Sequence, residues 1–268
     1  MKLLNGAEVA GFVKERQAKA VRGLIQNQKT QPRLAIIRTN PDPVVDTYMR
    51  LKIAYGEDIG AAVDVHTVDQ EEALSLIGKL NKDSSVHGII VQIPLPRPAQ
   101  TNEILNAVDP EKDVDGLNEK TKFDTATPTA INWLLNGYNI DLRAKKTVVV
   151  GQGRLVGKPL YELLKNSGFD VVAVDKKTPN IETIVGDADI IISATGRPNS
   201  IKNSMVKPGA VVVDAGTSTD ANGLVGDVEP SVRERDDITI TPVSGGVGPL
   251  TVSALFENVI RAAQNASH

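Results

Sequence analysis

VVVGQGRLVGKP, at residues 148–159, decides the fold of the second half of this chain. Its valines favour a buried β-strand, because β-branched side chains suit the pleated surface of a sheet. Gly151 and Gly153 then let the backbone approach a ligand closely, and Gly157 lies near the start of a helix expected over residues 156–168. Free backbone N–H groups at a helix N-terminus favour anions, so the stretch predicts a phosphate-binding turn.

The spacing of these glycines, G-x-G-x-x-x-G, is one residue longer than the common dinucleotide fingerprint. The next apolar run, FDVVAVD, ends at Asp175, eighteen residues after Gly157. A carboxylate at that strand end can accept a hydrogen bond from the ribose 2′-hydroxyl of a dinucleotide. The turn and the acid together predict a dinucleotide site. A flavodoxin-like turn with a surface aspartate is the other interpretation of the same residues.

Strand and helix patterns alternate on both sides of this turn. Apolar runs at residues 188–196 and 209–216 follow it. The segments that precede it are GAEVAGFVKERQAKAVRGLIQNQ (6–28), RLAIIRT (33–39), AAVDVHTV (61–68), EEALSLIGKL (71–80) and HGIIVQIPLP (87–96). Helices that alternate with short strands indicate βαβ units and parallel sheets.

We therefore predict a two-domain α/β protein. Its N-terminal α/β domain is expected over residues 1–120, and its Rossmann-like dinucleotide-binding domain over residues 121–249. The last segment, LTVSALFENVIRAAQN, is amphipathic, so we expect a terminal helix at residues 250–268 that packs back on the first domain. A chain of 268 residues is long enough for each domain to bury its own core.

Composition argues against several classes of function. A formal net charge of −3 offers no basic surface for nucleic acid or an anionic membrane. Cysteine is absent, which excludes disulfides and thiolate nucleophiles, and the three histidines His66, His87 and His268 are scattered. The sequence has no G-x-S-x-G stretch, no signal-peptide core and no apolar stretch long enough to span a membrane. We expect a cytoplasmic protein without a metal, nucleic-acid or membrane partner.

DTYMRLK, at residues 46–52, places Tyr48 and Lys52 four positions apart, so in a helix both lie on one face. We expect that helix to begin at Asp42-Pro43, because an acidic N-cap followed by proline is a typical helix start. Both side chains would then lie near the carboxyl end of the preceding strand, where open α/β sheets bind ligands. A solvated helix surface is the other interpretation of this pair.

Five segments match the motifs of one family in their order along the chain. They are Tyr48-Met49-Arg50-Leu51-Lys52 for Y-V-x-x-K, Val91-Gln92-Ile93-Pro94-Leu95-Pro96 for V-Q-L-P-L-P, Lys112-Asp113-Val114-Asp115-Gly116 for K-D-V-D-G, Val156-Gly157-Lys158-Pro159 for V-G-x-P, and residues 241–251 for T-P-V-P-G-G-V-G-P-M-T. With these segments the chain resembles the bifunctional methylenetetrahydrofolate dehydrogenase/cyclohydrolases over almost its whole length.

The resemblance implies that 5,10-methylenetetrahydrofolate is oxidised to the methenyl compound, which is then hydrolysed to 10-formyltetrahydrofolate. It implies that the residues 1–120 form the folate-binding catalytic domain. Lys52 would carry the hydrolysis and Gln92 would hydrogen-bond it, while Tyr48 would pack on the folate ring and Asp115 would hold the pterin N–H donors. A sheltered lysine protonates less readily and can take part in proton transfer. The loop residues implied for substrate binding are Gly245, Gly246 and Pro249.

The resemblance also implies a nicotinamide cofactor, with NADP favoured and NAD as the other option, and it implies a homodimer. The implied cofactor-binding residues are Gly151, Gln152, Gly153, Arg154, Val156, Gly157, Asp175, Lys176, Thr195 and Gly196.

The chain departs from the family pattern at both sites. On the folate side, Val45 replaces a serine, Ala126 a cysteine and Ser244 a proline. On the cofactor side, Gly151-Gln152-Gly153 replaces G-R-S and Asp175-Lys176 replaces H-S. An aspartate at this position repels a 2′-phosphate and favours NAD, whereas the cations Arg154, Lys176 and Lys177 can pair with the phosphate of NADP.

Three other functions remain open on the sequence alone. A two-domain nicotinamide dehydrogenase of shikimate or malate type would share the architecture without binding folate. A folate- or dinucleotide-binding protein without turnover would keep the site but lack the activity. A monofunctional dehydrogenase would keep Lys52 but hydrolyse slowly.

Overall fold

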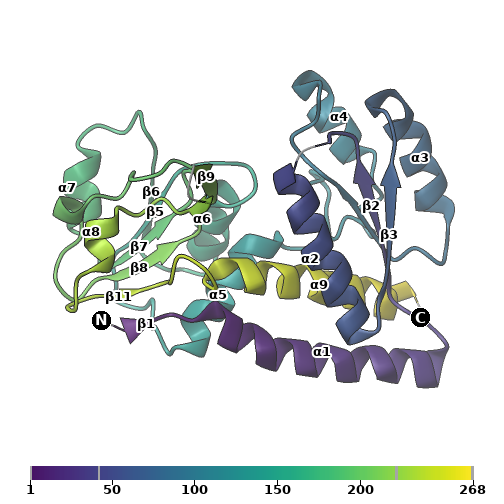
Figure 1. Ribbon diagram of the computed structural model, residues 1–268, viewed down its shortest axis with the longest axis horizontal. Helices are drawn as coiled ribbons and strands as arrows, with labels where there is room; N and C mark the ends of the chain where they lie inside the picture. The colour runs from purple at the N-terminus through teal and green to yellow at the C-terminus, as the bar shows by residue number, and fades with distance from the viewer. Residues whose placement is uncertain (1, 42, 221–222, 267–268) are drawn as a thin grey trace. The chain divides into compact units, whose positions relative to one another are not determined.

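The computed structural model describes residues 2–41, 43–220 and 223–266, and the chain forms two compact units (Figure 1). The first unit consists of residues 1–10 and 127–251, and the second of residues 11–126 and 252–268. Each unit contains a parallel sheet with helices, so the prediction of a two-domain α/β protein is confirmed.

A six-stranded parallel sheet forms the centre of the first unit, in the order β1-β11-β8-β7-β5-β6. Its strands are β1 (Lys2–Leu3), β5 (Thr147–Val150), β6 (Val171–Val174), β7 (Ile190–Ser193), β8 (Val211–Asp214) and β11 (Thr239–Ile240). The chain passes from β5 to β6 on one side of β5 and then crosses to β7 on its other side. The carboxyl ends of β5 and β7 therefore flank a topological switch point, where open α/β sheets bind ligands.

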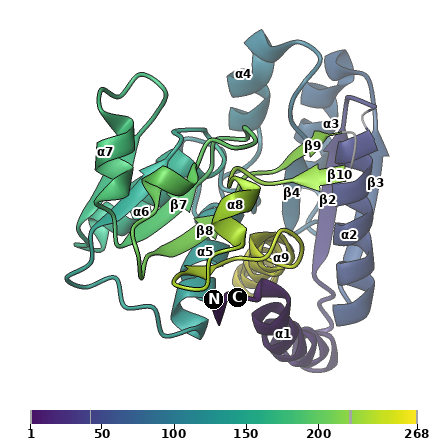
Figure 2. The same cartoon turned by 60° about the vertical axis from the view of Figure 1, so that its left-hand side comes forward.

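Short helices and a hairpin complete this unit. They are α5 (Ala126–Gly137), α6 (Gly157–Asn166), α7 (Ile181–Gly186), η2 (Asn203–Met205), α8 (Pro230–Arg233), and the antiparallel strands β9 (Ser218–Asp220) and β10 (Gly223–Val225). Figure 2 shows this hairpin extending beyond the strands of the sheet. Val185 of α7, Met205 of η2 and Val232 of α8 pack in one buried cluster with sheet residues such as Val148 and Val212.

The first ten residues belong to this unit, although the sequence analysis assigned them to the domain at residues 1–120. The reason is strand β1, because Lys2 pairs with Thr239 and Leu3 with Ile240. The backbone N–H of Leu4 also donates to the carbonyl of Ile240 at 2.9 Å. Two paired residues create no periodic pattern that a reading of the sequence can detect.

The second unit is built on a three-stranded parallel sheet in the order β3-β2-β4, formed by β2 (Arg33–Arg38), β3 (Ala62–Thr67) and β4 (Gly88–Val91). Its shorter helices are α2 (Pro43–Ile59), α3 (Gln70–Lys82), η1 (Pro98–Gln100) and α4 (Thr101–Asn106). Figures 1 and 2 show α2 and α3 on opposite faces of the sheet. Ala35 and Ile37 of β2 cluster with Ile77 of α3, whereas Gly56 of α2 lies against Val63 of β3.

The central strand β2 creates a second switch point. The chain runs from β2 through α2 to β3 on one side, and then through α3 to β4 on the other. The carboxyl ends of β2 and β4 therefore flank the position where a ligand is expected.

Two long helices, α1 (Gly6–Gln28) and α9 (Val247–Ala266), contribute most of their length to the second unit. The side-chain amide of Gln17 donates to the carbonyl of Ser253 at 2.8 Å, and the ring of Tyr55 in α2 stacks on Phe256 with centroids 5.2 Å apart. The Asn258 amide donates to the carbonyls of Val114 and Asp124, each at 2.9 Å. No helix in the described part of the chain combines the length and apolar character needed to cross a membrane.

Candidate active site

The glycine turn occupies the switch point of the first unit, between β5 and α6. Gly151 has φ +98°, and a Cβ there would lie 2.5 Å from the carbonyl oxygen of Ala194, in the loop after β7. A Cβ on Gly157 would lie 1.9 Å from the carbonyl oxygen of Gly151. By contrast, no atom lies within 4 Å of the position that a Cβ on Gly153 would take. The turn is therefore tight on its protein side and open at Gly153, an arrangement that fits a pyrophosphate lying against the backbone.

The other residues predicted to bind the cofactor follow the same strands. Gln152, Arg154 and Val156 lie in the turn itself, and the side-chain amide of Gln152 donates to the carbonyl of Gly151 at 2.7 Å. Thr195 and Gly196 follow β7 and so lie in the loop that Gly151 contacts.

Asp175 directly follows β6 and closes a local turn. Its Oδ1 accepts the backbone N–H of Lys177 at 2.8 Å, and its own N–H donates to the hydroxyl of Thr178 at 3.0 Å. The side chains of Lys176 and Lys177 are exposed. One carboxylate and two ammonium groups therefore stand at the strand end where the 2′ substituent of a dinucleotide ribose is expected.

Lys52 and Gln92 meet at the switch point of the second unit. The ammonium of Lys52, on α2, donates to Oε1 of Gln92 at 3.0 Å. Gln92 follows β4 directly, and its backbone N–H donates to the carbonyl of Ile37 at 2.9 Å, which continues the ladder between β4 and β2. Two residues 40 positions apart are thus brought together by strand order. Tyr48 lies one turn before Lys52 on the same helix and is half-buried.

Asp115 completes this group from a tight loop beyond β4. Burial lowers the pKa of Lys52, and the negative charge of Asp115 acts in the opposite direction. Burial also raises the pKa of Asp115. The positive charge of Lys52 lowers this pKa, and the negative charge of Asp113 raises it further. The two groups are thus close enough for their charges to interact, and burial removes both partly from water.

The K-D-V-D-G segment shapes the loop that carries Asp115. The N–H of Ile89 in β4 donates to the carbonyl of Lys112 at 2.8 Å, and buried Val114 packs against Gly88. Buried Asp113 accepts the backbone N–H of Asn118 at 2.8 Å. Residues 112–114 of the segment therefore serve structure, and Asp115, which follows them, interacts with the charge of Lys52. The role of Asp113 was not predicted, although the motif contains it.

The predicted folate loop, with Gly245, Gly246 and Pro249, lies in the first unit, whereas Tyr48, Lys52, Gln92 and Asp115 lie in the second. The N–H of Ala7 donates to the carbonyl of Gly245 at 3.0 Å. A Cβ on Gly6 would lie 1.8 Å from the carbonyl oxygen of Gly246. The start of α1 thus holds this loop through a contact between residues 240 positions apart, which the sequence analysis missed.

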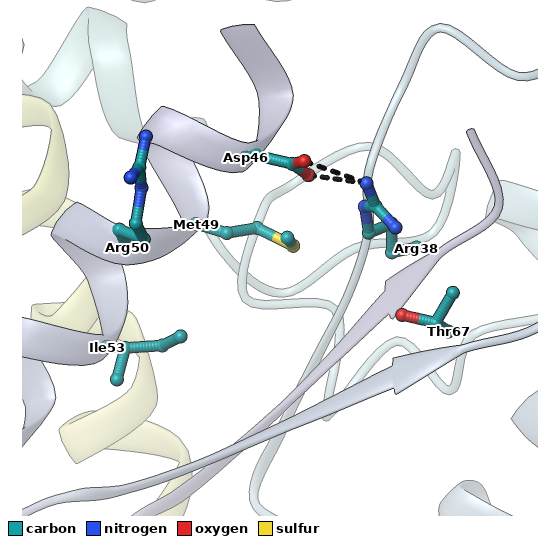
Figure 3. Close-up of a pocket in the computed structure, with 6 residues that line it drawn as sticks. All are labelled: Arg38, Asp46, Met49, Arg50, Ile53 and Thr67. Carbon is teal, nitrogen blue, oxygen red and sulfur yellow. Dashed lines mark hydrogen bonds and ion pairs between the residues drawn. The ribbon is translucent and has the colours of Figure 1, made fainter. Parts of the chain in front are cut away.

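A surface pocket of about 530 Å³ opens on a face of α2 other than the one that carries Tyr48 and Lys52 (Figure 3). Its lining residues are Arg38, Asp46, Met49, Arg50, Ile53 and Thr67. Asp46, in the first turn of α2, forms an ion pair with Arg38 at the end of β2, with 2.7 Å between the charged atoms. Helical spacing puts Tyr48 and Lys52 on another face, so the pocket contains none of the residues predicted for catalysis.

Comparison with known families decides where this chain belongs. The catalytic-domain model of tetrahydrofolate dehydrogenase/cyclohydrolase matches residues 4–115, and the NAD(P)-binding-domain model of the same family matches residues 125–267.

The chain belongs to the tetrahydrofolate dehydrogenase/cyclohydrolase family. The resemblance expected from its motifs is therefore confirmed.

Individual members of the family align over their full length. The bifunctional protein FolD of Campylobacter curvus is 38% identical over 279 residues, covering 99% of this chain and 96% of that protein. The crystal structure of FolD from Campylobacter jejuni aligns with a TM-score of 0.93 at 35% identity and covers 99% of each chain. FolD from Trypanosoma brucei, solved with NADP cofactor and an inhibitor, gives a TM-score of 0.91 at 31% identity, covering 98% of this chain and 97% of that one.

The interpretation as a shikimate dehydrogenase is not favoured. A shikimate dehydrogenase in complex with NADP⁺ aligns with a TM-score of only 0.55 at 16% identity, covering 90% of this chain and 96% of that one, which shows a shared fold alone.

The departures from the family pattern have different surroundings. Ala126 is buried at the first position of α5, and Ser244 is exposed. Asp42, the expected N-cap of α2, and the side chain of Val45 lie outside the described residues; α2 itself is observed from Pro43.

Proposed function

We propose that this chain oxidises 5,10-methylenetetrahydrofolate with a nicotinamide dinucleotide and hydrolyses the resulting methenyl compound to 10-formyltetrahydrofolate. The observation that carries the proposal is the Lys52–Gln92–Asp115 group. It joins a lysine of lowered pKa, its 3.0 Å hydrogen bond and a carboxylate at one switch point. Membership of the tetrahydrofolate dehydrogenase/cyclohydrolase family supports both activities.

In the dehydrogenase step, a dinucleotide held at the glycine turn would supply the acceptor for a hydride from the methylene carbon of the folate. The chain contributes mainly position. Asp115 is suited to accept the N–H donors of the pterin, and Tyr48 offers a ring face one turn before Lys52. A pterin analogue without those donors would leave the buried carboxylate unpaired, which gives the site its specificity.

In the cyclohydrolase step, water adds to the cationic methenyl carbon and loses one proton. The carbon–N5 bond then breaks, N5 takes up a proton, and the new hydroxyl loses its proton as it becomes the carbonyl of the formyl group, which stays on N10. Two protons leave and one is taken up, so the overall step releases one proton. Lys52 in its neutral form can accept the proton of the attacking water, and burial lowers its pKa toward the range in which that form is present. The Gln92 Oε1 atom fixes the direction of the Lys52 amine.

An absorbance assay with 5,10-methylenetetrahydrofolate tests this proposal, run in parallel with NADP and NAD. Appearance of reduced nicotinamide establishes the dehydrogenase, and absence of accumulated methenyl product adds the cyclohydrolase. Melting shifts with folate and dinucleotide, without turnover, would instead show a non-catalytic binding protein. Accumulation of methenyl product would show a monofunctional dehydrogenase.

The pH dependence of hydrolysis tests the assignment of Lys52 as the base. The wild-type rate on 5,10-methenyltetrahydrofolate is expected to rise with pH through the lowered pKa of Lys52, because only the neutral amine accepts a proton. In Asp115→Asn the midpoint of the pH profile should move to lower pH. The carboxylate of Asp115 stabilises the ammonium form of Lys52, so its removal lowers the pKa of Lys52. A midpoint that stays in place, or moves upward, would argue against an interacting pair. Rates are compared after subtraction of the uncatalysed hydrolysis at each pH.

NADP is the dinucleotide that we favour. The exposed ammonium groups of Lys176 and Lys177 outnumber the single carboxylate of Asp175, and one oxygen of that carboxylate is already bonded to the Lys177 N–H. Positive charge at this strand end favours a 2′-phosphate. The FolD of Trypanosoma brucei was solved with NADP, which supports the same choice.

Exchange of Asp175 for serine should strengthen this preference. In Asp175→Ser, the ratio of kcat/KM with NADP to kcat/KM with NAD is expected to rise roughly tenfold, because a repulsive charge and an acceptor for the ribose hydroxyl are both removed. Asp170→Ser is the matched control, since Asp170 is exposed and precedes the same strand at its other end. An unchanged ratio in Asp175→Ser would remove this residue from cofactor choice.

We also infer a cytoplasmic homodimer, on the resemblance to the family. Sedimentation equilibrium of the purified protein should give the mass of two chains, and the mass of one chain would overturn the inference.

A further inference from the structure

Asp227, an acidic residue of the first unit, lies between β10 and α8 and has no solvent exposure. Its Oδ2 accepts the hydroxyl of Ser193 and the backbone N–H of Thr195, each at 2.6 Å. Its Oδ1 accepts the backbone N–H of Arg197 at 2.9 Å. Three donors from β7 and the loop that follows it thus converge on one carboxylate.

Asp227 is itself held by another buried acid. Asp214, at the end of β8, accepts the backbone N–H of Asp227 at 3.0 Å and that of Val228 at 3.2 Å. It also forms an ion pair with Arg233 of α8, whose guanidinium donates to the carbonyl of Thr241 at 2.8 Å. The peptide that carries Asp227 therefore cannot shift without breaking a buried charged network.

Close packing restricts the Asp227 side chain as well. A Cβ on Gly216 would lie 2.0 Å from Oδ1 of Asp227, and one on Gly226 would lie 2.0 Å from Oδ2 of Asp214. Both carboxylates thus fill the space that these two glycines leave. In this packing the Asp227 oxygens face the donors of β7 and of the loop that follows it.

The loop that Asp227 holds is one wall of the switch point. Its residue Ala194 is the one that Gly151 of the glycine turn approaches, so a shift of the loop also displaces the turn. A carboxylate suits this task better than an amide, because both its oxygens accept hydrogen bonds and charged acceptors bind N–H groups more strongly.

We propose that Asp227 is a positioning residue for the dinucleotide, whose buried carboxylate fixes the backbone of residues 195–197 against the glycine turn without touching the cofactor. The inference rests on the proposed function, which places the dinucleotide at Thr195 and Gly196. Asp214 and Arg233 act one step further away by orienting Asp227.

The test is Asp227→Asn in the full-length protein, with both activities measured on the same sample. An asparagine of the same shape accepts on one oxygen only, so its NH₂ group must oppose at least one of the three donors. The KM for NADP and the dissociation constant of NADP in a direct titration are expected to rise roughly tenfold or more. Hydrolysis of supplied 5,10-methenyltetrahydrofolate needs no dinucleotide, so its rate should stay within about twofold of wild type. A twofold change in rate corresponds to less free energy than the loss of one hydrogen bond.

Two further variants separate positioning from general damage. Ser193→Ala removes one donor and leaves the carboxylate in place, so a smaller rise in the KM for NADP, about threefold, is expected even if Asp227→Asn fails to fold. Ile240→Val weakens the core of the same unit without touching the loop, and should lower the melting temperature with no change in the KM for NADP.

An unchanged KM and dissociation constant for NADP in Asp227→Asn and Ser193→Ala would overturn the inference. So would a rise in Ile240→Val as large as in Asp227→Asn, because loss of stability alone would then explain it. A wild-type protein that shows no dehydrogenase activity would instead overturn the proposed function, so the two failures are distinguishable.

Discussion

Lys52→Met is expected to abolish methenyl hydrolysis while the fold and dinucleotide binding remain at wild-type levels. General acid–base catalysis contributes roughly 10² to 10⁴ in rate, so a loss of at least about 10²-fold is expected when the amine is removed. Methionine matches the length of the lysine stem and suits a buried position. Asp115, whose pKa burial raises, can take up a proton once the ammonium is gone, so no unpaired buried charge need remain.

The measurement is the decay of 5,10-methenyltetrahydrofolate absorbance, with thermal unfolding and NADP titration on the same preparation. Arg50→Met is the matched control. Arg50 is an exposed cation of α2 that lines the pocket in Figure 3, and helical spacing puts it on a different face from Lys52, so its loss should leave hydrolysis unchanged. Full hydrolysis in Lys52→Met would exclude Lys52 as the proton acceptor.

Gly157→Ala is expected to have the second large effect, on the dehydrogenase. The added methyl group would lie 1.9 Å from the carbonyl oxygen of Gly151, a contact with backbone that no side-chain rotation can relieve. Either α6 or the glycine turn must move, so the unit is destabilised by about 1–3 kcal/mol. Since the turn positions the dinucleotide, kcat/KM for NADP should fall roughly 10²-fold or more.

Gly153→Ala provides the contrast for this prediction. With no atom within 4 Å of the added methyl group, the melting temperature should stay near wild type. NADP affinity should still fall, because the methyl group enters the space predicted for the pyrophosphate. Equal melting temperatures and full dehydrogenase activity in Gly157→Ala would show that the turn tolerates a side chain, and would contradict the packing described above.

The local chemistry of this chain could be predicted from its sequence. The strand that ends just before Gly151, the helix starting at Gly157 and the face shared by Tyr48 and Lys52 depend on neighbours within about one helical turn or one strand. Periodicity and turn residues report such short-range preferences directly. The motif around Asp115 also marked the residue beside Lys52, although its loop geometry depends on the buried residues Asp113 and Val114.

Weakly patterned elements could not be predicted in the same way. Strand β1 has two residues and α8 has four, too few to show a period, and both exist because of partners far along the chain. Residues 1–10 were assigned to the predicted folate-binding domain, residues 1–120, from sequence order alone. Pairing with β11 places them in the other unit.

The sequence by itself determined the fold class and the glycine turn, because these follow from short-range preferences, and its motifs indicated the residues of the candidate site through the resemblance to the family. Only the tertiary structure decided which distant residues meet. Strand order brings Gln92 within hydrogen-bond distance of Lys52. At the start of α1, Gly6 packs closely against Gly246. The path of the chain after β10 places Asp227 where it accepts the backbone N–H of Thr195. Such contacts join residues 32 to 240 positions apart, and loop closure at that range is driven by burial of the whole core.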